Sequence, residues 1–187
     1  MRIGFDFDGV LCLTPFGRLA VHAPSPVPDL PVGYAALYDQ ERSSNPLRLA
    51  MEYARFGWRT SAPDAGAILH GIADAHEIYI VTGRSWAGEP LVRRWLRRHK
   101  LDDRIAGIRM APPGLRPAQH KLATARLLGI DVHIDDDPRT AYHLANNGIE
   151  HVYLLDHAGA HGETPLPPHL TLVRSLQEFA SAITTSA

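Results

Sequence analysis

The sequence predicts an α/β fold in which a parallel β-sheet lies between two layers of helices. From residue 64 onward, helical and strand patterns alternate along the chain, as they do where crossover helices connect parallel strands. Several of the apolar runs end in acidic or hydroxyl residues followed by glycine or proline. Residues 12–60 interrupt the alternation. At 187 residues, the chain is therefore most simply one domain with an insertion.

Periodicity and capping signals define the expected elements. Helices are predicted at 64–75, 87–100, 117–128 and 138–147, and strands at 77–81, 104–109, 131–134 and 150–155. Pro138 stands near the first turn of the fourth helix, and Gly148 stops it. An edge strand at 170–173 and a closing helix at 175–184 complete the pattern. Right-handed crossovers would bring the carboxyl ends of the strands to one crevice.

The interrupting segment is expected to form a small helical cap over a core made of residues 1–11 and 61–187. Prolines cluster at its start, and helical patterns follow at 33–41 and 45–56, the second capped by Asn45. Its aromatic residues could stack on a base and its arginines could hold a phosphate or carboxylate. Equally, apolar residues at helical spacing could pack the cap onto the core. The aromatic residues are Tyr34, Tyr38, Tyr53, Phe56 and Trp58; the arginines are Arg42, Arg48, Arg55 and Arg59; the apolar spacing involves Tyr34, Leu37 and Tyr38, then Leu47, Ala50, Met51 and Ala54.

Two carboxylates and a glycine follow the first apolar run. Side chains alternate along a strand, so Asp6 and Asp8 are expected to project to the same side. Two like charges this close together repel each other, which raises the pKa of one carboxyl group or requires a bound cation. Mg²⁺, which prefers oxygen ligands, is the usual cation where a phosphate must also bind. Asp6 could then attack phosphorus while Asp8 transfers protons. Alone, the segment also fits a buried strand that ends in an Asp-Gly turn.

Three more segments follow in order. The run Ile78–Arg84 offers the Thr82 hydroxyl and the following backbone N–H groups to an anion. Lys121 stands at the head of the helix predicted at 117–128. The run Val132–Pro138 delivers three consecutive carboxylates into a turn, which is electrostatically costly without a cation. Each segment alone also fits a strand end or a solvated charge.

Taken together, these segments resemble the four motifs of the haloacid dehalogenase (HAD) superfamily of aspartate-nucleophile phosphohydrolases. The resemblance implies a three-layer, Rossmann-like parallel sheet with a cap inserted after the first strand. It implies that Asp6 is the nucleophile, that Asp8 is the acid/base, and that Thr82 and Lys121 assist. The implied phosphate-binding residues are Asp6, Phe7, Asp8, Thr82, Gly83 and Lys121.

The same resemblance implies a Mg²⁺ site. Its ligands would be the Asp6 carboxylate, the backbone carbonyl of Asp8 and an acid of the fourth motif. Asp136 is the first choice for that acid, and Asp135 is the alternate or supporting residue. Asp137 would be a turn or cap residue.

The function expected from the resemblance is Mg²⁺-dependent hydrolysis of a small phosphomonoester through an aspartyl-phosphate on Asp6. Asp8 implies chemistry at phosphorus, because family members that dehalogenate carbon lack a carboxylate at this position. The core is similar to the 5′(3′)-deoxyribonucleotidase-like branch, so a nucleoside monophosphate is one candidate substrate. A phosphotransferase or phosphomutase would use the same residues. A non-catalytic binding protein is the alternative of another class.

Composition limits the partners. The formal charge of −1 gives no general attraction to nucleic acid or to anionic membranes. We therefore expect a small phosphorylated metabolite as partner, no long nucleic acid and no membrane. The single cysteine, Cys12, cannot form an intrachain disulfide and is expected to be a buried thiol. An early first strand and the lack of a bilayer-length apolar stretch favour a cytoplasmic location.

Overall fold

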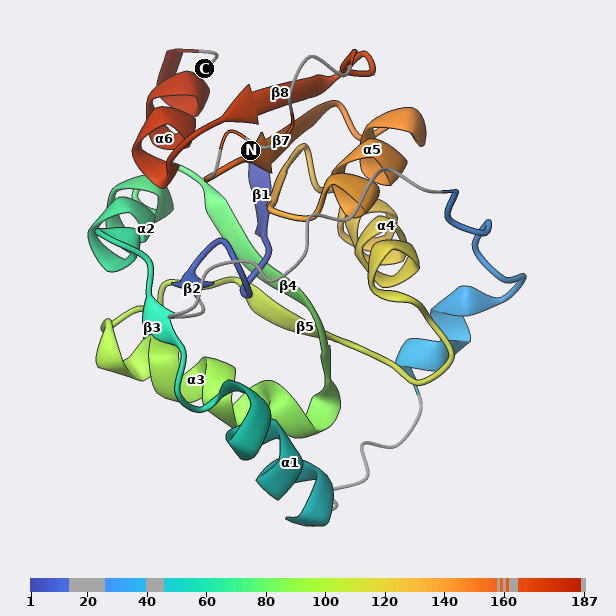
Figure 1. Cartoon of the computed structure of the whole chain (residues 1–187), viewed down its shortest axis with the longest axis vertical. Helices are drawn as coiled ribbons and strands as arrows, with labels where there is room; N and C mark the ends of the chain where they lie inside the picture. Colours follow the sequence, from blue (N-terminus) through green and yellow to red (C-terminus); the bar gives the residue numbers. More distant parts are fainter. Residues whose placement is uncertain (14–25, 40–45, 158, 160, 162–164, 186–187) are drawn as a thin grey trace.

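The computed structural model describes residues 1–13, 26–39, 46–157, 159, 161 and 165–185. Its centre is a six-stranded sheet with the order β5-β4-β1-β6-β7-β8 (Figure 1). All of its strand pairs are parallel. The strands are β1 (Arg2–Phe5), β4 (Glu77–Ser85), β5 (Gly107–Ala111), β6 (Val132–Asp135), β7 (His151–Leu155) and β8 (Leu170–Val173). The predicted α/β class is confirmed.

Helices cover both faces of the sheet. They are α2 (Ala65–Ala73), α3 (Glu89–Arg98) and α6 (Leu176–Thr185) on one face, and α4 (Pro117–Leu128) and α5 (Pro138–Asn146) on the other. The core is divided accordingly into two apolar clusters. Ile80 and Val81 are neighbours in β4 but belong to opposite clusters, because successive side chains of a strand point to opposite faces. The sheet is therefore buried on both sides, as parallel sheets are.

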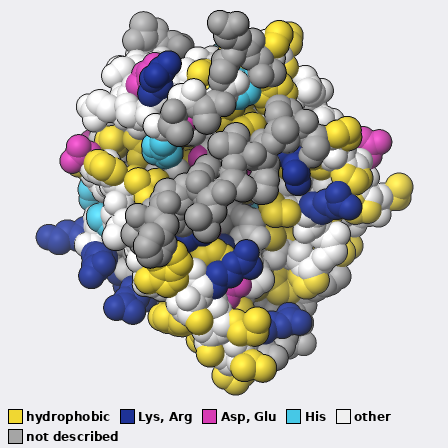
Figure 2. Space-filling model, in the orientation of Figure 1, with side chains coloured by type: hydrophobic (Ala, Val, Ile, Leu, Met, Phe, Trp, Pro, Cys, Tyr) yellow, Lys and Arg dark blue, Asp and Glu magenta, His cyan; other side chains and the backbone are white. Residues whose placement is uncertain are grey.

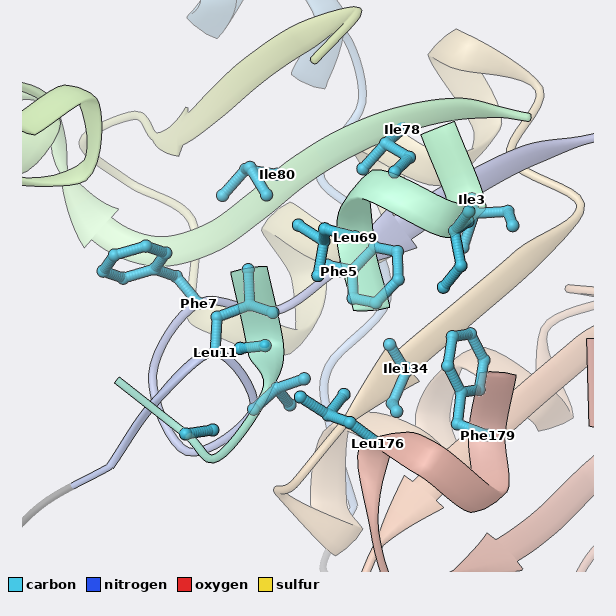
Figure 3. Close-up of a cluster of buried hydrophobic side chains, with 14 of the residues drawn as sticks. Ile3, Phe5, Phe7, Leu11, Leu69, Ile78, Ile80, Ile134, Leu176 and Phe179 are labelled. Carbon is cyan, nitrogen blue, oxygen red and sulfur yellow. The ribbon is translucent and has the colours of Figure 1, made fainter. Parts of the chain in front are cut away.

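The larger cluster packs β1 and β4 against α2, α3 and α6. Figure 3 shows Phe5 and Phe179 facing each other across this cluster, and their rings meet edge to face with centroids 5.5 Å apart. From α3, Leu91 and Trp95 are buried. The α3 arginines are exposed and contribute basic side chains to that side of the molecule (Figure 2). The first strand, which positions the loop that follows it, is thus anchored by apolar contacts.

The predicted boundaries of two strands are wrong. β4 continues past residue 81 to Ser85, because β5 pairs with it as far as Ser85 through a register shift after Thr82. β5 begins at Gly107 rather than at residue 104. Arg104 lies in a turn, where its backbone N–H donates to the Leu101 carbonyl at 3.0 Å.

The predicted insertion begins and ends beside the sheet. β2 (Cys12–Leu13) and β3 (Thr60–Ser61) form a short antiparallel pair, which brings the two ends together directly after the β1 loop. The helix expected at 33–41 is a shorter 3₁₀ helix, η1 (Tyr34–Tyr38), and the helix expected at 45–56 is α1 (Pro46–Phe56). Asn45 and Arg42 lie outside the described residues. Cys12 is buried as expected, and burial raises the pKa of its thiol to about 12.

η1 and α1 rest on different elements. η1 packs against α4, whereas α1 lies beside the 3₁₀ helix η2 (Trp86–Gly88) that follows β4. Leu47 and Met51 on α1 are 68% and 63% exposed. Figure 2 shows hydrophobic side chains gathered at the lower end of the molecule, where α1 lies. The interpretation that the apolar stripe of α1 packs onto the core is therefore wrong.

No helix in the described part of the chain is both long and apolar enough to span a bilayer.

Candidate active site

The candidate site lies where the order of the sheet reverses. From β1 the chain proceeds to β4 and β5 on one side, and then to β6, β7 and β8 on the other. At such a switch point, the connections leave the sheet in opposite directions and open a space at the carboxyl ends of the strands. β1 and β6 are neighbours, and the Asp6 N–H donates to the Ile134 carbonyl at 3.0 Å. The first and fourth motifs therefore meet, although they are far apart in the sequence.

A buried lysine connects these two motifs. Lys121, from α4, has its Nζ 3.0 Å from Asp6 Oδ2 and 2.7 Å from Asp135 Oδ2. Burial lowers the pKa of Lys121, but Asp135 and Asp6 outweigh this and raise the pKa above its ordinary value. Burial likewise raises the pKa of Asp135, but Lys121 and His133 outweigh it and hold that pKa below its usual range. A charged Lys121–Asp135 pair therefore forms the floor of the site.

Asp6 is in the opposite electrostatic situation. Burial raises its pKa well above the ordinary value, and the charges of Asp135, Asp136 and Asp8 act in the same direction against Lys121. Negative charge is therefore in excess around Asp6. Asp6, Asp135 and Asp136 each offer a carboxylate oxygen, and these oxygens lie within 4.8 Å of one another. The set fits a hard divalent cation such as Mg²⁺, which prefers oxygen ligands and would offset the excess charge.

The two acids of the fourth motif differ in their surroundings. Asp135 Oδ2 accepts from Lys121 and lies 3.3 Å from His133 Nε2, while Oδ1 accepts the Asp137 N–H at 3.0 Å. Both carboxylate oxygens of Asp135 therefore already accept hydrogen bonds. Asp136 lies against the loop that follows β1. Asp135 therefore holds Lys121 in place, and the choice of Asp136 as the direct metal ligand stays a prediction.

Gly9 allows the first motif to approach the fourth. Its φ is +88°, and a Cβ at this position would stand 1.7 Å from Asp136 Oδ2. Only glycine fits both the backbone conformation and the space. The Gly9 carbonyl accepts from His157 Nε2 at 2.9 Å, so that nitrogen carries the proton. The loop is thus held from the β7 side of the sheet as well.

Asp8 binds partners other than those of Asp6. Its carboxylate forms a bidentate pair with Arg84, in which Nε and Nη2 each donate at 2.6 Å, and Arg59 Nη1 donates to Oδ1 as well. β1 ends at Phe5, so Asp6 and Asp8 lie in the loop beyond the strand, where strict alternation does not apply. Strand alternation, which was the basis for expecting both side chains on one side, therefore does not set their directions. The Asp8 side chain lies outside the group formed by Asp6 and the acidic pair.

The second motif lies inside β4. Thr82 is fully buried, and its Oγ1 accepts the Arg84 N–H at 3.3 Å. A Cβ at Gly83 would stand 2.9 Å from the Pro117 side chain, so this glycine lets β4 approach the first turn of α4. Phe7 from the first motif is buried, and its ring meets Trp95 edge to face. The structure thus places every predicted site residue on the first motif's loop, on β4, on α4 or at the end of β6.

Three residues around these motifs were not predicted as site residues. Arg84 stands two positions after Thr82, and His133 stands two before Asp135, so strand periodicity could have indicated both.

His120, the third of these residues, directly precedes Lys121 in the sequence. Burial lowers the pKa of His120 to about 3, while its Nε2 donates to the Arg109 carbonyl at 3.3 Å and its Nδ1 lies 2.8 Å from the Tyr38 hydroxyl. A neutral histidine therefore fastens η1 to the helix that carries Lys121.

No family model and no curated protein matches the chain. Solved structures do. A predicted phosphatase from Clostridium acetobutylicum superposes with a TM-score of 0.62 at 12% identity, covering 98% of both chains. A haloacid dehalogenase-like family hydrolase from Streptococcus pneumoniae gives 0.60 at 13% identity over 97% of each chain. A HAD-superfamily hydrolase of subfamily IA from Geobacter sulfurreducens gives 0.56 at 13% identity, covering 97% of this chain and 95% of its own. The chain therefore has the fold of HAD-like hydrolases.

Proposed function

We propose that the protein is a Mg²⁺-dependent phosphohydrolase that cleaves a small phosphomonoester, with Asp6 as the nucleophile. The arrangement of Lys121 carries this proposal. One buried ammonium group contacts both Asp6 and Asp135, and Asp136 completes the acidic cluster. A carboxylate that can attack, a fixed cation and a place for a metal therefore meet at one point. The likeness to solved hydrolases and a predicted phosphatase supports the same reading.

Asp6 would begin the reaction. Lys121 holds Asp6 Oδ2, which leaves Oδ1 as the attacking atom. As the Oδ1–P bond forms, the bond from phosphorus to the leaving oxygen breaks, and Asp8 delivers a proton to that oxygen. Asp8 then takes a proton from water, the water oxygen attacks phosphorus, and the Oδ1–P bond breaks. Inorganic phosphate leaves and the Asp6 carboxylate is restored.

Several groups would neutralise the phosphoryl oxygens. Lys121 supplies a full charge, Thr82 a hydroxyl, and Phe7, Asp8 and Gly83 their backbone N–H groups. Mg²⁺ held by Asp6, by Asp136 and by the Asp8 carbonyl would add charge that polarises the phosphoryl group.

Residues 12–60 act as the cap in this proposal. The β2–β3 pair joins them to the core. The nucleotidase-like branch and a cytoplasmic location remain predictions from the sequence. A phosphomutase or another phosphotransferase would share every step up to the aspartyl-phosphate and would differ in passing the phosphoryl group to an acceptor other than water.

Phosphate release from a panel of nucleoside monophosphates, sugar phosphates and an aryl phosphate tests the proposal. With Mg²⁺ we expect release from at least one substrate, and with chelator a fall of at least about 100-fold, because excess buried negative charge would then oppose the incoming phosphate. Transfer of the phosphoryl group to a second panel member in place of release would favour the phosphotransferase. No turnover of any kind, or turnover that chelator leaves unchanged, would contradict the proposal.

A further inference from the structure

Two arginines converge on the proposed acid/base residue. Asp8 accepts three guanidinium N–H groups, two from Arg84 and one from Arg59. One bidentate guanidinium is already enough to orient a carboxylate. The second arginine therefore needs another explanation.

Arg84 has the geometry of a permanent partner. Its side chain is 2% exposed. The guanidinium carbon stands 5.0 Å from the centre of the Phe7 ring and 4.2 Å from the centre of the Phe56 ring, so two aromatic rings restrict it. Arg84 is thus a positioning residue for Asp8, fixed by β4 and by the end of α1.

Arg59 is held less completely. It shares Asp8 Oδ1 with Arg84, its side chain is 17% exposed, and its Nε is buried without a hydrogen-bond partner among the described residues. Phe56 keeps its guanidinium in place from one side, with the carbon 4.8 Å from the ring centre. A guanidinium has five N–H donors, so Arg59 has further donors besides the one that binds Asp8, and they lie at the edge of the site.

The location of Arg59 indicates where such donors would act. It directly precedes β3, whose pairing with β2 places it next to the first motif. In the proposed reaction, Asp8 exchanges a proton with the leaving oxygen while the bidentate Arg84 pair holds it, so Arg59 can exchange Asp8 Oδ1 for another acceptor. Because Arg59 stands beside the acid, it also stands on the leaving-group side of the phosphoryl group.

We propose that Arg59 binds a second anionic group of the substrate. The substrate is then a phosphomonoester whose leaving group carries a further phosphate or carboxylate close to the scissile bond. Its anion accepts the donors of Arg59 and frees Asp8 for proton transfer, while Arg84 continues to orient Asp8. This assignment rests on the proposed phosphohydrolase function and specifies its substrate class.

Matched ligand pairs test the assignment without turnover. In the Asp6→Asn background with Mg²⁺, calorimetry would compare phenyl phosphate with 2-carboxyphenyl phosphate, and propanediol monophosphate with propanediol bisphosphate. We expect at least one doubly anionic ligand to bind about 10-fold or more tighter than its partner, as a charge-assisted pair allows. The pair that shows the preference identifies the second group as a carboxylate or a phosphate.

Substitution of Arg59 decides the cause of the preference. Arg59→Gln is expected to reduce it to less than about twofold. Arg55→Gln is the matched control, because Arg55 also stacks on Phe56, at 5.0 Å, but is not assigned to the substrate; it should keep the preference. If Arg59→Gln does not fold, Arg59→Lys, which loses the planar fork, should reduce the preference instead. Equal affinities within both pairs, or a preference that survives loss of Arg59, would overturn the assignment.

Hydrolysis by the unsubstituted protein separates the two proposals. If both members of every pair bind with equal affinity and release phosphate at equal kcat/KM, the phosphohydrolase proposal is supported and the role of Arg59 is refuted. If the binding preference depends on Arg59 but no substrate releases phosphate, the anion site at Arg59 is supported and the phosphohydrolase proposal is refuted.

Discussion

Replacing Asp6 with Asn is expected to reduce phosphate release by at least about 10⁴-fold, because an amide cannot form the covalent intermediate. Folding should be retained. Because the pKa of Asp6 is raised in the folded protein, stability falls as the pH rises from the ordinary aspartate pKa through the raised one, and the neutral amide avoids this loss. Phosphate release and urea unfolding of the metal-free protein at pH 7.5 would measure the two effects.

Asp131→Asn is the matched control for this substitution. Asp131 stands at the opposite end of β6, where its carboxylate accepts the Arg2 N–H at 2.8 Å. It lies away from the proposed chemistry, so its variant should keep turnover. Turnover by the Asp6→Asn protein within about tenfold of the unsubstituted protein would refute the nucleophile assignment.

Replacing Lys121 with Met is expected to lower both stability and activity. Methionine has a similar length, but Asp6 and Asp135 would lose the cation that contacts both of them. Breaking a buried ion pair from one side costs about 3–5 kcal/mol, and loss of the fixed charge should lower kcat by at least about 100-fold. Urea unfolding and phosphate release would measure the two losses.

Arg93→Met provides the comparison, because Arg93 pairs with Glu89 at 2.8 Å on the surface of α3 with its side chain 47% exposed. Such a pair contributes at most about 1 kcal/mol. If Mg²⁺ binds the acidic cluster, it should restore part of the stability lost with Lys121. A Lys121→Met protein as stable as the Arg93→Met protein would show that Lys121 does not hold the cluster together.

Much of the fold was predictable because long apolar periodicities determine it. The alternation from residue 64 indicated the parallel sheet, and capping signals indicated α4, which runs from Pro117 to Leu128 as expected. The end of β4 was harder to predict from the sequence. Its extension depends on pairing with β5, and local sequence contains no direct sign of that pairing.

The position of a site residue was predictable where a sequence motif determines it. It was less predictable where neighbouring residues from other parts of the chain determine it. Asp6, Lys121 and Asp135 meet as the order of the motifs implied. The orientation of Asp8 could not be foreseen, because it depends on Arg84 in β4 and Arg59 beyond α1, which only the folded chain brings together. The alternative in which the apolar side of α1 packs onto the core failed because an amphipathic pattern does not say what its apolar side covers.

Chemical trapping of the covalent intermediate would show directly whether Asp6 is the nucleophile. Borohydride reduces an aspartyl-phosphate to homoserine, so the protein would be quenched with it during turnover with Mg²⁺ and the best substrate of the panel, and its peptides would be mapped by mass spectrometry. We expect homoserine at position 6 only when substrate is present, and none at position 8. Turnover with an unmodified residue 6, or with homoserine at another aspartate, would contradict Asp6 as the nucleophile.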